Sequence, residues 1–283
     1  MSLHPAAPED LPALTAAYVQ TIQSISDLGH SLRPGDVERE TQCPGWTVLD
    51  QFAHVVSLEA WVQGEEPPEP DADADDTAQR PGIGGIVDRF LASRRDRSLE
   101  ELLEELDDLA TSRVQHLEAE TTSPDDPAIG PFGATTLHGL MENRLFDLWV
   151  HEQDIREAIG RPGNLDGPAA AHVVRLLFAA LPRIVARTAQ VPDGHAVILD
   201  LSGPVVGRAG ARVEERDGKP HGIPLFTGDT EQHPDVVTTT ITMSTQAATR
   251  RAAGRVSTQD THVTVTGDED IARRVLDALV IAP

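Results

Sequence analysis

Apolar residues recur at helical spacing through the first two thirds of the chain. The first stripe, with steps of three and four residues, comprises Leu11, Leu14, Tyr18, Ile22, Ile25 and Leu28. Such spacing places the side chains on one face of a helix. Pro34 and Gly35 follow the stripe and end the element. The pattern therefore predicts an amphipathic N-terminal helix with one buried face.

Two later helix starts carry capping-box patterns. Thr47 is followed by Asp50 three residues on, and Ser98 is followed by Glu101. In such a pair, each side chain accepts a hydrogen bond from the other residue's backbone N–H, which satisfies two unpaired donors at the helix start. The predicted helices, with a restart at Ser98 in the second, cover residues 47–62, 86–117 and 136–159.

The residue pattern changes after Gly160–Gly163, where the preceding helix is predicted to end. A helix over residues 168–188 is followed by short runs with β-branched residues and alternation, and a closing helix covers residues 271–279. The predicted strands are 196–201, 211–215, 236–243 and 262–265. The prolines and glycines of residues 123–133 predict a loop. We expect an α+β protein, with a four-helix bundle over residues 1–165 and a smaller α+β domain over residues 166–283.

Composition and charge narrow the function classes. The 283 residues carry 23 basic and 46 acidic side chains, a net charge of -23 that disfavours nucleic acid and anionic lipid as partners. The acidic segment Glu65–Thr77 predicts a solvated loop. No uninterrupted run of eighteen apolar residues is present, which argues against a membrane-spanning helix. The N-terminus does not resemble a secretory signal, and the single cysteine excludes an internal disulfide. We therefore expect a cytoplasmic protein, monomeric or homodimeric.

The predicted helix over residues 136–159 carries a polar stripe on an apolar face. Asp147 and His151 are four residues apart, and Asp154 follows His151 by three, so all three are neighbours on one side. Buried charge is costly unless it is paired or bound to a metal. On spacing alone, a metal-binding pair, an i,i+4 ion pair and a capped core histidine all remain open.

His54, in the middle of the second predicted helix, is the best candidate for a third ligand. Phe52, Val55 and Val56 surround it with apolar residues, so its ring is expected to point inward. Two histidines and one carboxylate would leave a coordination position of a divalent metal open for water or substrate, as in catalytic sites.

Two segments resemble the signatures of a known family. Cys43-Pro44-Gly45-Trp46-Thr47, continued by Asp50 and His54, resembles the second helix of the DinB-like, mycothiol-dependent maleylpyruvate isomerase family. The segment from Asp147 through Trp149, His151, Asp154 and Arg156 to Gly163 resembles its fourth helix. The chain near Gly254-Arg255 and Val265–Asp268 also resembles the family's small α+β domain, so the likeness covers nearly the whole sequence.

The resemblance implies a four-helix bundle with a metal, usually zinc, held by His54, Asp147 and His151. The family often has glutamate where Asp147 stands, and the shorter arm would draw the metal inward or weaken that ligand. The implied cosubstrate is mycothiol, a low-molecular-weight thiol whose pKa falls on metal binding, so that the thiolate can attack a small electrophile. The implied reaction is an isomerisation or an S-transfer. A non-catalytic metal-binding protein and a metal-dependent hydrolase are the alternatives.

Two further residues receive roles. Arg255 resembles the family's arginine after glycine and is the candidate anchor for a substrate carboxylate, against the alternative of a surface arginine beside Arg250 and Arg251. Asp154 is expected to contact a ligand histidine and orient its ring. The alternative is a surface carboxylate that pairs with Arg156 or Arg161.

Other candidates have weaker support. Cys43 lies before a proline with no adjacent base, which favours a packed loop thiol over a nucleophile or ligand. His138 is out of phase with Asp147. The three tryptophans are predicted to be core or pocket-wall aromatics: Trp46, Trp61 and Trp149. Of these, Trp61 lies two helical turns from His54 on the same face and is a candidate for the pocket wall.

Overall fold

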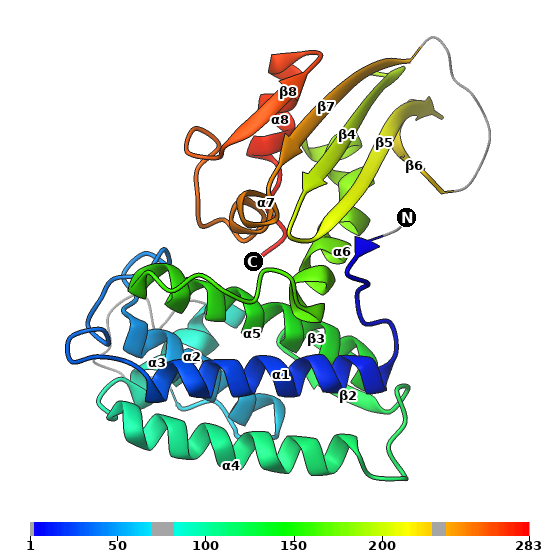
Figure 1. The fold of residues 1–283 in the computed structure, drawn as a ribbon. Coiled ribbons are helices and arrows are strands. Elements are labelled where there is room, and N and C mark those ends of the chain that lie inside the picture. Colours follow the sequence, from blue (N-terminus) through cyan, green and yellow to red (C-terminus); the bar gives the residue numbers. More distant parts are fainter. Residues whose placement is uncertain (1–2, 70–81, 228–235, 283) are drawn as a thin grey trace. The chain divides into compact units, whose positions relative to one another are not determined.

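The computed structural model describes residues 3–69, 82–227 and 236–282 (Figure 1). The chain divides into two compact units. One runs from Glu9 to Pro162, and the other combines the N-terminal segment up to Pro8 with the chain from Gly163 onward. The first unit is helical and the second contains the main sheet, so the predicted α+β class is confirmed.

The first unit is a bundle of four long helices with a fifth packed beside it. Helix α1 lies against α4 and α5, α2 lies against the same two helices, and α3 packs on α2 (Figure 1). The predicted apolar stripe of α1 is buried along its whole length, as are Phe52, Leu106 and Leu145 on the other helices of the bundle. The helices are α1 (Leu11–His30), α2 (Val48–Val62), α3 (Ile83–Arg94), α4 (Leu99–Leu117) and α5 (Leu137–Ile159).

Both predicted capping boxes form. Thr47 and Asp50 exchange side-chain to backbone hydrogen bonds at the start of α2, and Ser98 and Glu101 do the same at the start of α4. Because the cap determines where the first turn begins, it also fixes which side chains of α2 point into the bundle.

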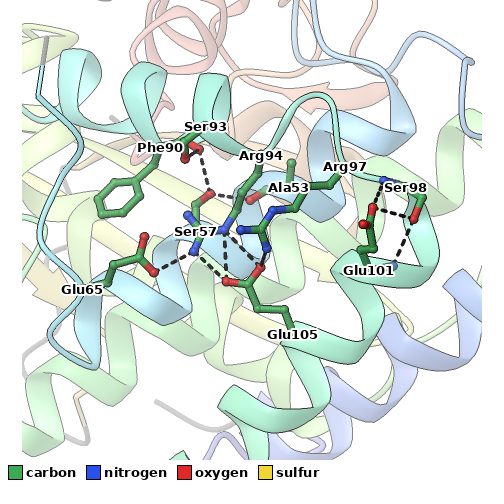
Figure 2. A network of polar contacts seen from close by, with 10 residues as sticks. All are labelled: Ala53, Ser57, Glu65, Phe90, Ser93, Arg94, Arg97, Ser98, Glu101 and Glu105. Carbon is green, nitrogen blue, oxygen red and sulfur yellow. Dashed lines mark hydrogen bonds and ion pairs between the residues drawn. The ribbon is translucent and has the colours of Figure 1, made fainter. Parts of the chain in front are cut away.

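A buried arginine attaches α3 to its neighbours. Arg94 is only 3% exposed, and its Nη2 atom donates to Glu65 and to Glu105 Oε1, each at 2.7 Å (Figure 2). Arg97 also pairs with Glu105, and the Ser57 hydroxyl of α2 donates to the Phe90 carbonyl of α3. The charge of Arg94 is therefore balanced inside the protein, as a buried charge requires.

The prediction of a loop over residues 123–133 was wrong in part. Strands β2 (Pro127–Gly130) and β3 (Gly133–Thr136) form an antiparallel hairpin. Gly133 has a φ of 103°, which allows a connection of only two residues. Pro127 is the first residue of its strand, where a missing N–H is tolerated. Of the acidic segment, residues 70–77 lie outside the described residues.

The second unit is a mixed sheet with helices. Strand order is β1-β5-β4-β7-β8, with β6 also paired to β5; β4 and β7 are parallel and all other pairs antiparallel. Helix α6 and the turn η1 pack on β5 and β6, and α8 packs on β7 and β8. The elements are β1 (Leu3–His4), α6 (Pro168–Arg183), η1 (Ile184–Thr188), β4 (His195–Ser202), β5 (Val206–Arg216), β6 (Lys219–Leu225), β7 (Val237–Met243), α7 (Thr245–Ala252), β8 (Val263–Thr266) and α8 (Glu269–Asp277).

Three elements of this unit were not predicted. Strand β6 contains Pro220 and Pro224, which break the strand pattern but are tolerated because, among the described strands, β6 pairs with β5 alone. Strand β1 is two residues long and joins the N-terminal segment to β5, whereas the sequence analysis placed that segment with the bundle. Helix α7 has a single short apolar face, formed by Ala248 and Ala252.

One helical segment bears on the prediction that the chain has no membrane-spanning helix. Residues 168–188, which form α6 and η1, are long and apolar enough to cross a membrane by length and composition. In the structure, 67% of the most apolar window is buried. Leu177, Leu181 and Val185 are each fully buried, as in the core helix of a folded domain.

Candidate metal centre

Two facing helices bring the predicted ligands together. His54 lies in the middle of α2, and Asp147 and His151 lie one turn apart on α5, which packs against α2. One oxygen of Asp147, Oδ1, is 3.5 Å from His54 Nε2 and 3.4 Å from His151 Nε2. The three donor atoms all lie within 4.8 Å of one another.

These separations suit a tetrahedral metal. Ligand bonds of 2.0–2.1 Å at tetrahedral angles place neighbouring donor atoms about 3.3–3.4 Å apart. The aspartate arm is therefore long enough to reach the two imidazoles. Its side chain is 28% exposed, against 6% for His54 and 8% for His151, so the centre meets solvent on the Asp147 side.

His54 presents a neutral ring to the centre. It is 5% exposed, and neither ring nitrogen has a hydrogen-bond partner among the described residues. Burial, assisted by the neighbouring His151, lowers its pKa to about 4. A buried imidazole with an unused lone pair beside a carboxylate oxygen is a polar group that a cation would satisfy.

Two side chains contact the ring of His151 at Nδ1, the nitrogen that does not face Asp147. Its Nδ1 atom lies 2.6 Å from Oε1 of Gln51, whose amide NH₂ donates to Thr41 at 2.8 Å. With the amide oriented in this way, Nδ1 carries the proton and Nε2 directs its lone pair at the centre. Asp154, fully buried, places Oδ2 3.4 Å from the same Nδ1. The buried position of Asp154 excludes the surface-carboxylate alternative.

Asp147 divides its two oxygens between two environments. Oδ2 accepts a hydrogen bond of 2.7 Å from Nη1 of Arg144, and Oδ1 faces the two histidines. Burial raises the pKa of the carboxyl, but the imidazoles of His151 and His54 outweigh that effect and hold it well below its usual range. The pKa of His151 is lowered by burial and raised by Asp147 and Asp154, with a net rise. Asp147 is thus ionised, as a metal ligand must be.

Trp46, rather than Trp61, covers the centre. Its ring stacks on His151 with centroids 6.0 Å apart and an interplanar angle of 18°, and it lies tilted over His54 at 5.0 Å. Trp61 instead contacts Phe90, at 6.0 Å between centroids. The indole of Trp46 is half-buried, so it forms a wall between the ligands and solvent.

Cys43 belongs to a second group of potential ligands, together with His151 and Asp154. The thiol is buried, and its sulfur lies 3.6 Å from Asp154 Oδ2. Because this group would need the Nδ1 side of His151, which already contacts Gln51, the group of His54, Asp147 and His151 is the better candidate.

Two other candidates lie elsewhere. Arg255 is in the second unit, half-buried, with Nη1 donating to the Ala253 carbonyl at 3.0 Å; its role as a carboxylate anchor stays a prediction. Arg250 and Arg251, its neighbours in sequence, are buried rather than on the surface. His138 contacts the Glu9 carbonyl, away from the other histidines, as its phase predicts.

Gln51 and Arg144 were not predicted as neighbours of the ligands, and Trp46 was predicted only as a core or pocket-wall aromatic. Arg144 is three residues before Asp147, so helical spacing was the available signal for it. Gln51 contacts His151 on the facing helix, which spacing along α2 does not indicate. Trp46 precedes the helix in a loop, where no periodicity indicates direction.

Comparison with known proteins gives a consistent result. Residues 18–156 match the family model described as the mycothiol maleylpyruvate isomerase N-terminal domain. Among solved structures, the mycothiol-dependent maleylpyruvate isomerase matches with a TM-score of 0.56 and 15% identity, over 92% of this chain and 95% of that chain. A histidine-to-alanine mutant of that enzyme matches over the same shares with a TM-score of 0.54 and 14% identity. At such identities, the likeness shows a common fold. No curated protein sequence matches the chain.

Proposed function

We propose that the protein is a metal-dependent enzyme that uses mycothiol on a small electrophile, because residues 18–156 match the model of the mycothiol maleylpyruvate isomerase N-terminal domain. His54, Asp147 and His151 are its proposed metal ligands. The observation that carries the proposal is the meeting of their three donor atoms within 4.8 Å, while neither ring nitrogen of buried His54 makes a hydrogen bond to the described residues.

The residues at the centre are suited to a divalent cation, zinc being the metal we propose. When bound, such a cation lowers the pKa of a coordinated thiol, so that the nucleophilic thiolate exists at neutral pH. The chain supplies three ligands and leaves a further position for the thiol. His54 and His151 offer lone pairs, and Asp147 offers one negative charge.

The surrounding groups hold this arrangement. Gln51 fixes the tautomer of His151, and Asp154 supports the same nitrogen from a fully buried position. Trp46 shields one side of the two imidazoles from water, which strengthens electrostatic interactions in the centre. Asp147 remains partly exposed, on the side from which a small molecule can approach.

The proposed reaction is an isomerisation. The thiolate adds to an activated alkene, the former double bond rotates as a single bond, and expulsion of the thiolate restores the alkene in the other geometry. In an S-transfer the adduct would be the product. Arg255 is the proposed anchor for a substrate carboxylate, since a guanidinium pairs with a carboxylate in bidentate fashion. We place the enzyme in the cytoplasm, where its buried thiol Cys43 would stay reduced.

Metal content tests the ligand assignment. Wild-type protein is expected to carry one divalent ion per chain, and His54→Ala and His151→Ala to lose it. His138→Ala is the matched control, because that ring contacts the Glu9 carbonyl and no ligand. A metal content unchanged by both ligand substitutions would contradict the assignment.

Product analysis separates the reaction classes. Candidate electrophiles such as a cis-alkene diacid are incubated with and without mycothiol. Turnover to the trans isomer only when thiol is present supports the isomerase, and a stable thiol adduct supports the transferase. Hydrolysis independent of thiol, or no turnover by metal-loaded protein, would contradict the proposal.

A further inference from the structure

A group of buried charges lies behind the proposed ligand Asp147. Glu59 of α2 is fully buried, Arg144 of α5 is 1% exposed and Arg113 of α4 is 5% exposed. Glu59 Oε1 accepts from Arg113 Nε at 3.0 Å, and Glu59 Oε2 accepts from both Nε and Nη2 of Arg144 at 3.2 Å. One carboxylate of α2 is thus paired with arginines from two other helices.

Burying such a group of charges in a bundle core costs free energy. Removing ions from water costs several kcal/mol per ion, and well-packed apolar residues of the same volume often give equal or greater stability. Leu106, Leu145 and Phe52 show that this bundle also fills core positions with apolar side chains. The charges therefore call for a role that apolar side chains do not perform.

The arrangement of Arg144 indicates that role. Its planar guanidinium directs Nε and Nη2 at Glu59, which leaves Nη1 to donate to Asp147 Oδ2 at 2.7 Å. All three nitrogens are engaged, so the guanidinium is fixed by Glu59 and in turn fixes the carboxylate plane of Asp147. With Oδ2 taken, Oδ1 is the oxygen that faces His54 and His151.

We propose that Arg144, held by Glu59, is a positioning residue that sets Asp147 for metal binding through a single oxygen. The inference rests on the proposed function, since it concerns the same centre. Glu59 and Asp147 together offset the charges of Arg113 and Arg144, but charge balance alone does not determine how the carboxylate of Asp147 is oriented. What Arg144 adds is direction: it holds the short aspartate arm with one oxygen aimed at the two imidazoles.

A charge-balanced pair of double variants tests this role. Arg144→Met with Glu59→Gln removes one positive and one negative charge and frees Asp147. Arg94→Met with Glu105→Gln removes one positive and one negative charge from another ion pair of the bundle and leaves Arg144 between Glu59 and Asp147, so it is the matched control. Circular dichroism establishes folding, and Co²⁺ is titrated against a chromophoric chelator while the visible spectrum of bound Co²⁺ is recorded.

We expect the Arg144 double variant to bind Co²⁺ about 10–100-fold more weakly than wild type, as is usual when a partner of a metal ligand is lost. We also expect its cobalt spectrum to change, which a loss of stability alone would not produce. The control should stay within about threefold of wild type with an unchanged spectrum. Equal affinity and identical spectra in the two double variants would overturn the inference.

Three further outcomes keep the test decisive. If the Arg144 double variant does not fold, Arg144→Lys replaces it: the ammonium keeps the charge but cannot span Glu59 and Asp147, and wild-type affinity with an unchanged spectrum in that variant would refute the positioning role. If wild-type protein binds Co²⁺ and Arg144 proves irrelevant, only the inference fails. If wild-type protein does not bind Co²⁺, or His54→Ala does not weaken binding, the proposed function itself fails.

Discussion

Replacing Gln51 tests the support of His151 without touching a ligand. Gln51 is fully buried, and Gln51→Met keeps its length while removing two hydrogen bonds: that of Oε1 with His151 Nδ1 at 2.6 Å and that of Nε2 with Thr41 at 2.8 Å. Nδ1 of His151 would then retain only the longer contact of 3.4 Å with Asp154. The ring would lose the acceptor that selects its tautomer.

The magnitude follows from these contacts. A neutral hydrogen bond contributes about 1 kcal/mol net, and both partners keep another polar neighbour, so the free energy of unfolding of the metal-free protein should fall by about 1–2 kcal/mol. Metal affinity should fall by about 10–100-fold, or about 1.4–2.7 kcal/mol, because loss of the group behind a ligand histidine typically has this effect.

The assay combines urea unfolding of the metal-free protein with chelator competition for Zn²⁺. Gln23→Met is the control, since Gln23 bonds to Asp27 on the exposed side of α1. A variant that loses stability but binds Zn²⁺ within twofold of wild type would refute the reasoning, because it would show that Gln51 supports the fold and not the orientation of His151.

Three other predictions concern separate parts of the molecule. Co²⁺ binding should quench tryptophan fluorescence more strongly in wild type and in Trp61→Phe than in Trp46→Phe, because Trp46 stacks on His151 whereas Trp61 contacts Phe90; equal quenching in both variants would contradict that contact. The pKa of Glu59 is raised by burial but lowered further by the two arginines, so its stabilisation is present above pH ~4.5 and is lost as the pH falls below that value. Urea midpoints between pH 3 and 6 should therefore fall more steeply for wild type than for Glu59→Gln, and parallel curves would refute this assignment. A Cβ at Gly222 would lie 2.0 Å from a backbone oxygen of α6, so Gly222→Ala should destabilise the second unit by at least about 2 kcal/mol. A Cβ at Gly84 on α3 would meet open space, so Gly84→Ala should stabilise the protein by up to about 1 kcal/mol. Thermal melts that rank the two variants otherwise would contradict the packing.

Sequence reasoning located the helices well, because their signals are local. The apolar stripe of α1 and the capping boxes at Thr47 and Ser98 depend on residues within one or two turns, so they can be read without the fold. Strand β6 was missed because its prolines are tolerated only at a sheet edge, and being at an edge is a property of the complete sheet.

In the metal centre too, local patterns could be predicted from the sequence and long-range contacts could not. Asp147 and His151 are neighbours by helical spacing, but that spacing cannot show that α2 brings His54 to the same oxygen. The role of Trp46 depends on the path of a loop, and Glu59 pairs with Arg144 although the two residues are 85 positions apart in the chain. Contacts of this kind follow from packing rather than from local pattern.

The central claim is that His54, Asp147 and His151 hold a divalent metal that accepts a thiol. The most direct test is to load the protein with Co²⁺, add mycothiol and follow the sulfur-to-cobalt charge-transfer absorption. We predict that this band appears in wild type and in His138→Ala at one thiol per chain and is lost in His54→Ala and His151→Ala. A band of full intensity in the two ligand variants, or none in cobalt-loaded wild type, would contradict the account.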